Sequence, residues 1–287
     1  MSESEPMGIA VTLPVRETAE KNCFGRSKSM EVRLAESEED LYAAQTLRFE
    51  VFFQELGARG GNDACFAGRD VDRFDALCDH LIVTDKSIGD GHVHVVGTYR
   101  LLRHEVALAN GGFYTGQEFD IDPLLARAPA GTRFLEMGRS CVHPAYRNRP
   151  TIELLWRGIL AVANRAEANV LFGCASFPGT DPEPLAPLFS FLHHNALAPE
   201  EWRVRPHEKL RVETNRCEPG SYDDKAAFMS LPPLVKGYIR AGAWFSDGAC
   251  IDHDFGTTDV MLILPRAQVS PRYAARLGVG SWGPDGG

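Results

Sequence analysis

A pair of opposite charges stands inside a segment that otherwise suits a protein core. The segment LEMGRSCVHP, at residues 135–144, resembles a strand and carries Glu136 and Arg139. Residues three apart on a regular strand point to opposite faces of a sheet. A β-bulge at Gly138 would bring both side chains to one face and would aim a backbone N–H at a reacting carbonyl. We therefore predict a bulge at Gly138, beside a site of chemistry.

Three aspartates, Asp70, Asp72 and Asp75, fall within the short segment RDVDRFD at residues 69–75. Acidic runs of this kind usually lie in solvated loops. The alternative is a site for an ammonium group, which carboxylates bind well. We expect no metal site, because no further ligand follows at a recognisable loop spacing.

Two arginines lie in apolar surroundings. Arg48 belongs to the helix-like segment LRFEVFFQELG at residues 47–57, where it either sits on a solvated edge or projects into a cleft to hold an anion. Arg100 falls late in the β-branched segment VVGTYRLL at residues 95–102. A buried arginine there would need a carboxylate partner. Such a pair is either purely structural or also touches a substrate.

Two further arginines, Arg147 and Arg149, stand just before a helix whose first turn begins near Thr151. A helix N-terminus offers unpaired N–H groups and a partial positive charge. These residues would suit a phosphate, such as that of a phosphopantetheine arm. The alternative is that both arginines are ordinary surface side chains.

The elements that must position these residues alternate along the chain. Strand-like segments span residues 30–34, 79–84, 93–102, 134–142, 170–177 and 259–264, and helix-like segments span 37–56, 150–163, 184–197 and 234–241. This order predicts a mixed α/β or α+β fold built on one central sheet. No G-x-G-x-x-G opens a helix, which disfavours a dinucleotide-binding fold. We expect tails at residues 1–29 and 267–287, and one domain at 30–266 with an extension from about residue 200.

Composition narrows the class of protein. The 287 residues carry a formal net charge of −9, which argues against a nucleic-acid binder. No segment approaches the roughly 20 apolar residues of a membrane span. The acidic, proline-broken N-terminus does not resemble a targeting peptide, so we expect a cytoplasmic protein, with peripheral contact to the inner membrane left open. Seven cysteines without a C-x-x-C pair favour neither a disulfide framework nor a zinc site.

Taken together, these motifs resemble known families. LRFEVF, D-x-D-R-F-D, VVGTYRLL and LEMGRSCVHP resemble the acyl-homoserine-lactone synthases, which share the GNAT acyltransferase fold. The longer runs GRSCVHPAYRNRPTIELLWRGI and LFGCASFPGTDP resemble a sister family more closely, the L-ornithine Nα-acyltransferases of ornithine-lipid synthesis. So does the C-terminal run LPPLVKGYIRAGAWFSDG, and the resemblance spans roughly residues 40–266.

The resemblance implies a central mixed, twisted sheet flanked by helices and an N-acyltransferase activity. It implies that a 3-hydroxyacyl group passes from acyl carrier protein to the α-amine of L-ornithine, giving lyso-ornithine lipid. No resident cofactor is implied, since the carrier's acyl-phosphopantetheine arm is a co-substrate. The synthases' arginine and phenylalanine fall on Arg48 and Phe52, their two aspartates on Asp72 and Asp75, their strand arginine on Arg100, and their Glu–Arg pair on Glu136 and Arg139.

These assignments suggest roles for the residues. Glu136 would be the general base, and the two aspartates, Arg100 and Arg139 would order the acceptor. Ser140 and Cys141 would border the substrate, with a backbone N–H between Gly138 and Cys141 stabilising the oxyanion. The phosphopantetheine arm would lie against Arg147, Arg149 and Thr151.

Two departures from the common GNAT pattern matter. The segment that starts at Arg147 lacks the glycines of a coenzyme A loop, so a single phosphate on a carrier's arm fits better than a pyrophosphate. Residues 184–197 contain no tyrosine to protonate the leaving thiol, which leaves Ser190 and His193 as candidates.

Three alternatives stay open. One is an acyl-homoserine-lactone synthase that uses S-adenosylmethionine, against which the long extension past residue 200 counts. The second is a coenzyme-A-dependent GNAT enzyme that acts on another amine. The third is a non-catalytic protein that binds acyl carrier protein or lipid.

Overall fold

The structure is a computed structural model that describes residues 22–60, 67–89, 93–269 and 271–276. Most of the two predicted tails therefore lies outside the described residues. In the described part, no helix has both the length and the apolar character needed to cross a bilayer.

Strands and helices alternate along the chain. The strands are β1 (Cys23–Ser27), β2 (Met30–Leu34), β3 (Asp79–Asp85), β4 (Val95–Arg103), β5 (Phe119–Asp120), β6 (Phe134–Val142), β7 (Val170–Pro178), β8 (Arg205–Pro206), β9 (Arg211–Val212), β10 (Trp244–Phe245), β11 (Ala249–Asp252) and β12 (Thr257–Pro265). The α-helices are α1 (Glu38–Phe49), α2 (His104–Ala109), α3 (Asp122–Arg127), α4 (Arg149–Arg165), α5 (Ala186–Ala196), α6 (Asp224–Ser230), α7 (Pro233–Ala241) and α8 (Pro271–Arg276). A π-helical turn, η2 (Glu50–Glu55), extends α1, and a 3₁₀ turn, η3 (Tyr114–Gln117), precedes β5.

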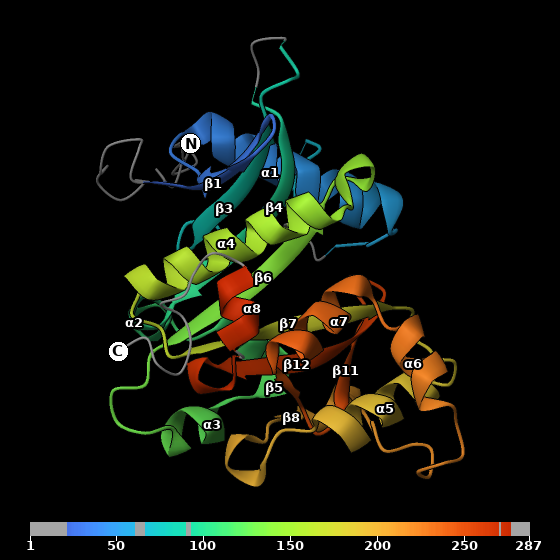
Figure 1. Cartoon of the computed structure of the whole chain (residues 1–287). Coiled ribbons are helices and arrows are strands. Elements are labelled where there is room, and N and C mark those ends of the chain that lie inside the picture. The colour runs from blue at the N-terminus through green and yellow to red at the C-terminus, as the bar shows by residue number, and fades with distance from the viewer. Residues whose placement is uncertain (1–21, 61–66, 90–92, 270, 277–287) are drawn as a thin grey trace, which may run out of the picture.

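One mixed sheet organises the molecule (Figure 1). Its strands lie in the order β1-β2-β3-β4-β6-β7-β12-β11-β9, and β10 pairs with β12 beside β11. Neighbouring strands are antiparallel except β6 and β7, which are parallel. A small separate sheet joins β5 to β8.

Helices cover both faces of this sheet. Helix α4 packs on β1 to β4, and α5, α7 and α8 contribute to the same apolar layer. Helices α1, α2 and α3 cover the opposite face. Asn148 caps α4, since its side-chain oxygen accepts a hydrogen bond from the Thr151 N–H. The glycine at position 158 lets this helix approach the side chains of Leu81 and Val32.

The parallel strands β6 and β7 form a fork. They pair only over Phe134–Glu136 and Val170–Phe172, although β6 continues to Val142 and β7 to Pro178. Gly173 stands at the branching point, where a Cβ would lie 2.1 Å from the Met137 carbonyl oxygen. Beyond this point the facing edges of the two strands are free to receive another extended group.

Several predicted elements are confirmed. The strands at Met30–Leu34 and Phe134–Val142 match the prediction to the residue. Ser37 caps α1 as its capping pattern indicated, because its side chain accepts from the Asp40 N–H. The mixed sheet flanked by helices is also confirmed.

The predicted boundaries need correction. Strand β1, at Cys23–Ser27, lies in the predicted N-terminal tail and pairs with β2. In the predicted C-terminal tail, Val269 and Ala274 are buried and Tyr273 packs edge-on against Trp156. The extension past residue 200 supplies β12, which includes the strand expected at residues 259–264 and pairs with β7 in the central sheet.

A substitution that adds one methyl group to α4 tests how closely this helix packs on the sheet. In Gly158→Ala, the new methyl carbon would meet Leu81 at 2.5 Å and Val32 at 2.8 Å. We expect this overpacking to lower the free energy of unfolding by about 1–3 kcal/mol. Gly237→Ala is the matched control, since its methyl group would meet only Trp156 at 3.9 Å and alanine favours a helix. Denaturant melts that give both variants the same stability would contradict this account of the packing.

Candidate active site

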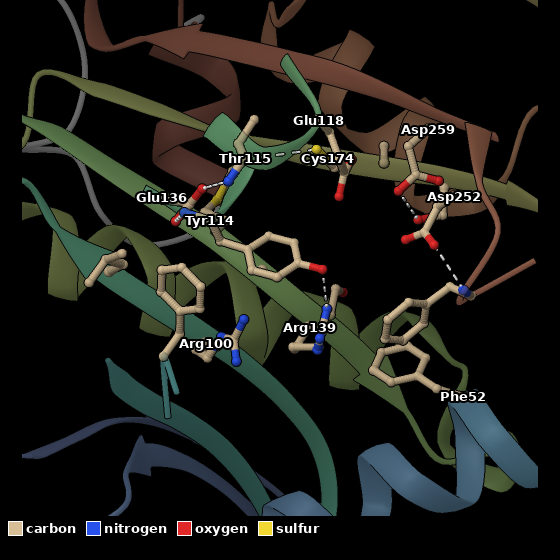
Figure 2. A pocket seen from close by; sticks show the side chains of 18 of the residues that line it. Phe52, Arg100, Tyr114, Thr115, Glu118, Glu136, Arg139, Cys174, Asp252 and Asp259 are labelled. Atoms are coloured by element: carbon tan, nitrogen blue, oxygen red, sulfur yellow. Dashed lines mark hydrogen bonds between the residues drawn. The ribbon is translucent and has the colours of Figure 1, made fainter. Parts of the chain in front are cut away.

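A cavity of about 230 Å³ opens at the fork between β6 and β7. Its walls come from η2, β4, η3, the two forked strands and the β11–β12 hairpin. Figure 2 shows side chains from all these elements turned toward a common space. The predicted site residues that line this cavity are Phe52, Arg100, Glu136, Arg139 and Ser140.

The predicted bulge exists in β6, one residue later than expected. The β4–β6 register steps from Thr98–Cys141 to Arg100–Gly138, so β6 holds one extra residue. Arg139 takes the left-handed conformation there, with φ of 49°, which few residues other than glycine adopt. The bulge turns this arginine to the cavity side of the sheet, where Glu136 also lies.

Three arginines and three aspartates alternate in a closed ring of ion pairs at one wall of the cavity. Around the ring they are Arg48, Asp70, Arg139, Asp72, Arg100 and Asp75, which returns to Arg48. Successive members are joined by N–O distances of 2.6–3.2 Å. Each charge therefore has two opposite neighbours, the arrangement that offsets the cost of removing ions from water.

Arg48 is the deepest member of this ring. Its side chain is 1% exposed, and its guanidinium donates to both carboxylates of Asp70 and Asp75 at 2.8 Å. It is therefore neither on a solvated edge nor a cleft residue that holds an external anion, and both sequence-based interpretations of Arg48 are wrong. It ties α1 to the segment that precedes β3.

The aspartates of the ring are occupied by arginines. Asp70 is fully buried, and Asp75 also accepts a hydrogen bond from Gln45 at 3.1 Å. Burial opposes ionisation, but Arg48 and Arg100 outweigh it and hold the pKa of Asp75 well below its usual range. Neither Asp72 nor Asp75 lines the cavity, so the prediction of an ammonium site or a solvated loop at this segment is wrong.

Arg139 is clamped between two aromatic rings. Its guanidinium carbon lies 4.9 Å from the centre of the Tyr114 ring and 4.5 Å from that of Phe255. Its Nη1 group donates to the Tyr114 hydroxyl at 3.3 Å. Ion pairing to Asp70 and Asp72 completes the clamp. The orientation of this charge toward the cavity is therefore fixed in advance of any ligand.

Glu136 lies at the closed end of the fork. One oxygen accepts from the Tyr114 N–H at 2.9 Å, and the other accepts from the Thr115 N–H at 2.6 Å. Each carboxylate oxygen retains a further lone pair. Burial raises the pKa of Glu136 above its ordinary value, which makes it a stronger base than an exposed glutamate.

A second group of acids, which the sequence did not single out, lies opposite the arginines. Glu118, Asp252 and Asp259 project into the cavity from the end of η3, from β11 and from β12 (Figure 2). Burial, and then the charges of the neighbouring carboxylates, raise the pKa of Glu118 to about 8 and that of Asp259 to about 6. The cavity is therefore polarised, with guanidinium groups on one side and carboxyl groups on the other.

The acids stand close to a thiol. Possible ligand atoms of Glu118, Cys174 and Asp259 all lie within 4.8 Å of one another. Burial and the adjacent acids raise the pKa of the Cys174 thiol well above its usual value, so it stays protonated. These three side chains therefore offer ligand atoms for a metal ion, and their carboxyl oxygens can equally accept hydrogen bonds from a donating cation.

The residues expected to hold a phosphopantetheine arm lie apart from the ring. Arg147 forms a two-pronged ion pair with Glu55, and Arg149 pairs with Glu153 on the surface. Thr151 is fully buried, and its hydroxyl donates to the side-chain Oδ1 atom of Asn148, so its side chain does not face a ligand.

Three other expected residues also fall outside the cavity. Cys141 packs in the core beneath α1, where its thiol donates to the Leu47 carbonyl oxygen. Ser190, a candidate acid for the leaving thiol, is buried and accepts from the N–H groups of Arg216 and Cys217. His193 contacts Thr214 instead of the fork.

A family model and several solved structures are similar to this chain. A family model described as an acetyltransferase (GNAT) domain matches residues 47–157. Among solved structures, one similar to this chain is the acyl-homoserine-lactone synthase LasI. The match covers 86% of this chain and 95% of LasI, with 14% sequence identity and a TM-score of 0.48. Another is FeeM, an N-acyl amino acid synthase from uncultured soil microbes. That match covers 84% of this chain and 94% of FeeM, with 10% sequence identity and the same TM-score.

Curated relatives are much more similar. The L-ornithine N(alpha)-acyltransferase of Agrobacterium fabrum is 48% identical over 271 residues, which cover 93% of this chain and 92% of the relative. The enzyme of the same name from Brucella abortus is also 48% identical, over 89% of this chain and 91% of its own. With this identity along nearly the whole of both chains, the protein belongs to the L-ornithine Nα-acyltransferase family and is an N-acyltransferase of the GNAT fold.

Proposed function

We propose that the protein transfers a 3-hydroxyacyl group from the phosphopantetheine arm of acyl carrier protein to the α-amine of L-ornithine, giving lyso-ornithine lipid. The polarised cavity at the fork of β6 and β7 is the observation that carries this proposal. An amino acid with a cationic side chain has one carboxylate and two ammonium groups. A cavity with arginines on one wall and carboxyl groups on the other complements those charges.

The arginine wall would receive the acceptor's carboxylate. Arg100 and Arg139 both line the cavity, and their guanidinium groups are already oriented by the ring of ion pairs. A guanidinium grips a carboxylate in a two-pronged fork. The α-amine, which is bonded to the same carbon as that carboxylate, would then lie beside β6.

The fork would receive the acyl thioester. Its strand edges are unpaired with each other beyond Glu136 and Phe172, so an extended arm can lie between them. Arg147 and Arg149 stand near the start of α4, and in our proposal they receive the phosphate of such an arm. The missing glycines in this segment favour the single phosphate of a carrier protein over the pyrophosphate of coenzyme A.

The reaction needs one proton to leave the amine. In our proposal Glu136 takes the proton that frees the α-ammonium nitrogen to attack, and that nitrogen bonds to the thioester carbon. The carbon–sulfur bond then breaks, and the second proton that the nitrogen sheds as the amide forms goes to the leaving thiolate. A backbone N–H of β6 near the bulge would stabilise the oxyanion. A thiolate is a stable leaving group near neutral pH, so the chemistry does not require a strong acid at Ser190 or His193. We propose that the protein acts in the cytoplasm and that its lipid product passes to the inner membrane.

The choice of substrates is tested by direct assay. Purified protein should release thiol from 3-hydroxyacyl carrier protein when L-ornithine is added, and mass spectrometry should show acylation at the α-nitrogen. The matched arm replaces the carrier with the corresponding acyl-coenzyme A. We expect kcat/KM to be at least about tenfold lower, because the segment at Arg147 lacks the glycines that let the backbone approach a pyrophosphate. Equal use of both donors would contradict the carrier assignment, and transfer to S-adenosylmethionine instead of ornithine would contradict the acceptor.

The base assignment is tested with Glu136→Gln. The amide keeps one acceptor for the N–H groups of Tyr114 and Thr115 but cannot take a proton. We expect kcat to fall by about 10²- to 10⁴-fold, the usual contribution of a general base. The wild-type rate should fall as the pH drops and Glu136 becomes protonated, and the variant should lose this limb of the profile. A variant with wild-type turnover would refute the role.

Carrier recognition is tested with Arg149→Ala. This exposed side chain should contribute a modest electrostatic attraction, so we expect KM for the acyl carrier protein to rise about fivefold with kcat unchanged. Arg133→Ala, which removes an exposed arginine paired with Glu167 at the start of β6, is the control. An equal change of KM in the two variants would show only a general effect of charge.

A further inference from the structure

We propose that Glu118, Asp252 and Asp259 form the subsite that binds the side-chain ammonium group of the acceptor. This inference rests on the proposed function and adds to it. It says which end of the cavity selects a diamino acid over an amino acid with a neutral side chain.

The three acids lack the counter-ions that the ring aspartates have. Among the side chains that the structure describes, no lysine, arginine or histidine forms an ion pair with Glu118, Asp252 or Asp259. All three nevertheless face the same cavity as Arg139. A buried carboxylate without a partner is unfavourable, so this end of the cavity is preorganised for a cation from outside the chain.

Individual oxygen atoms are also left without donors. Asp259 is 5% exposed, and its Oδ2 accepts from the Ser176 hydroxyl at 3.0 Å. Its Oδ1 atom is buried and has no hydrogen-bond partner in the described structure, and the same is true of Glu118 Oε2. Leaving such buried atoms without a hydrogen bond is unfavourable, and a bound donor would remove that cost.

The protonation of these acids supports the same conclusion. Their raised pKa values, about 8 for Glu118 and about 6 for Asp259, follow from burial and mutual repulsion. The free protein therefore holds a proton on this pair near neutral pH. An incoming ammonium group would displace that proton, because it supplies both positive charge and hydrogen-bond donors.

An ammonium group matches the geometry of the acids. It has three N–H donors, and the acids approach the cavity from three different elements, η3, β11 and β12 (Figure 2). With the carboxylate on Arg139 and the side-chain ammonium on the acids, the acceptor is held at both ends, which leaves its α-amine as the free nucleophile beside β6.

The test is a competition between two acceptors. L-norvaline has the carbon chain of L-ornithine without the terminal ammonium group, so the ratio of acylated ornithine to acylated norvaline, measured by mass spectrometry from one mixture, reports this subsite alone. Glu118→Gln and Asp259→Asn each replace a carboxyl group, which can ionise when the ammonium group binds, with an amide of the same shape that cannot. Asp120→Asn is the control, since it removes one charge from an exposed position on β5.

We expect the ornithine-to-norvaline ratio to fall about 10- to 100-fold in Glu118→Gln and Asp259→Asn, the loss of one charge-assisted hydrogen bond, and to stay unchanged in Asp120→Asn. A ratio that stays at the wild-type value in both cavity variants overturns the proposal, even if both rates fall together. Loss of wild-type activity with EDTA and its recovery with zinc would overturn it as well, by assigning the acids to a metal ion. A wild-type protein that acylates neither amino acid refutes the proposed function instead.

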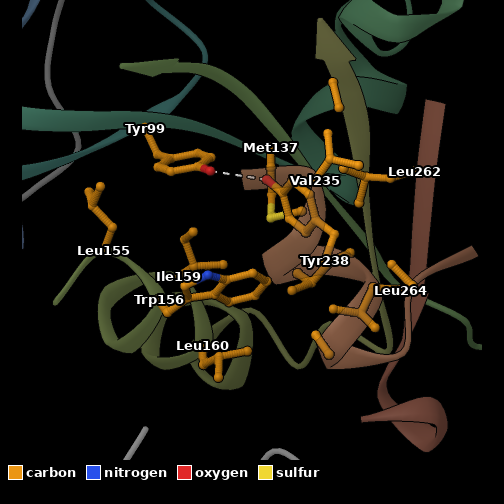
Figure 3. Close-up of a cluster of buried hydrophobic side chains, with 14 of the residues drawn as sticks. Tyr99, Met137, Leu155, Trp156, Ile159, Leu160, Val235, Tyr238, Leu262 and Leu264 are labelled. Atoms are coloured by element: carbon orange, nitrogen blue, oxygen red, sulfur yellow. Dashed lines mark hydrogen bonds between the residues drawn. The ribbon is translucent and has the colours of Figure 1, made fainter. Parts of the chain in front are cut away.

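Figure 3 shows a cluster of buried apolar side chains on the opposite face of the sheet from the cavity. There Tyr99 and Tyr238 join their hydroxyls at 3.0 Å, and Trp156 packs edge-on against Tyr238. This apolar layer holds β4, α4 and α7 together behind the cavity. Cavity variants that keep this layer intact should retain the fold, which circular dichroism of each variant checks.

Discussion

Charge pairing around Asp70, Asp72 and Asp75 fixes how Arg100 and Arg139 face the cavity. A single buried charge would cost several kcal/mol, whereas alternation in a closed ring leaves every member with opposite neighbours. Neither arginine of the cavity wall can turn away without breaking its ion pairs. The cationic wall is thus ready before an acceptor arrives, which is the preorganisation that catalysis requires. The acids on the opposite wall have no such partners among the residues that the structure describes, and this contrast gives the cavity its polarity.

Local patterns were sufficient to predict the long elements. The strand at Phe134–Val142 and the cap at Ser37 follow from rules that act over a few residues. Strand β1, at Cys23–Ser27, was missed because its five residues include a glycine and two polar side chains, and pairing with β2 stabilises it. The bulge was expected at the glycine, but the register shift lies at Arg139, whose ion pairs outweigh the strain of its left-handed backbone.

The site was only half predictable, for a physical reason. The sequence singles out charges in apolar segments, which is how Glu136, Arg100 and Arg139 were found. It does not show which charges neutralise one another, so the ring aspartates were assigned to a substrate although arginines occupy them. Glu118 and Asp259 were not predicted as site residues because they lie far apart in the chain and neither belongs to a charged motif. Only the folding of η3 onto β12 brings them together.

One measurement tests the central claim that opposite walls of the cavity hold the two ends of the acceptor. It is a crystal structure of the protein with L-ornithine bound. The account predicts the carboxylate within hydrogen-bonding distance of the Arg139 guanidinium and the side-chain nitrogen among the acids at Glu118 and Asp259, with the α-nitrogen beside β6. Ornithine bound in the reverse direction, with its side-chain nitrogen at β6, or bound outside the fork, would contradict it.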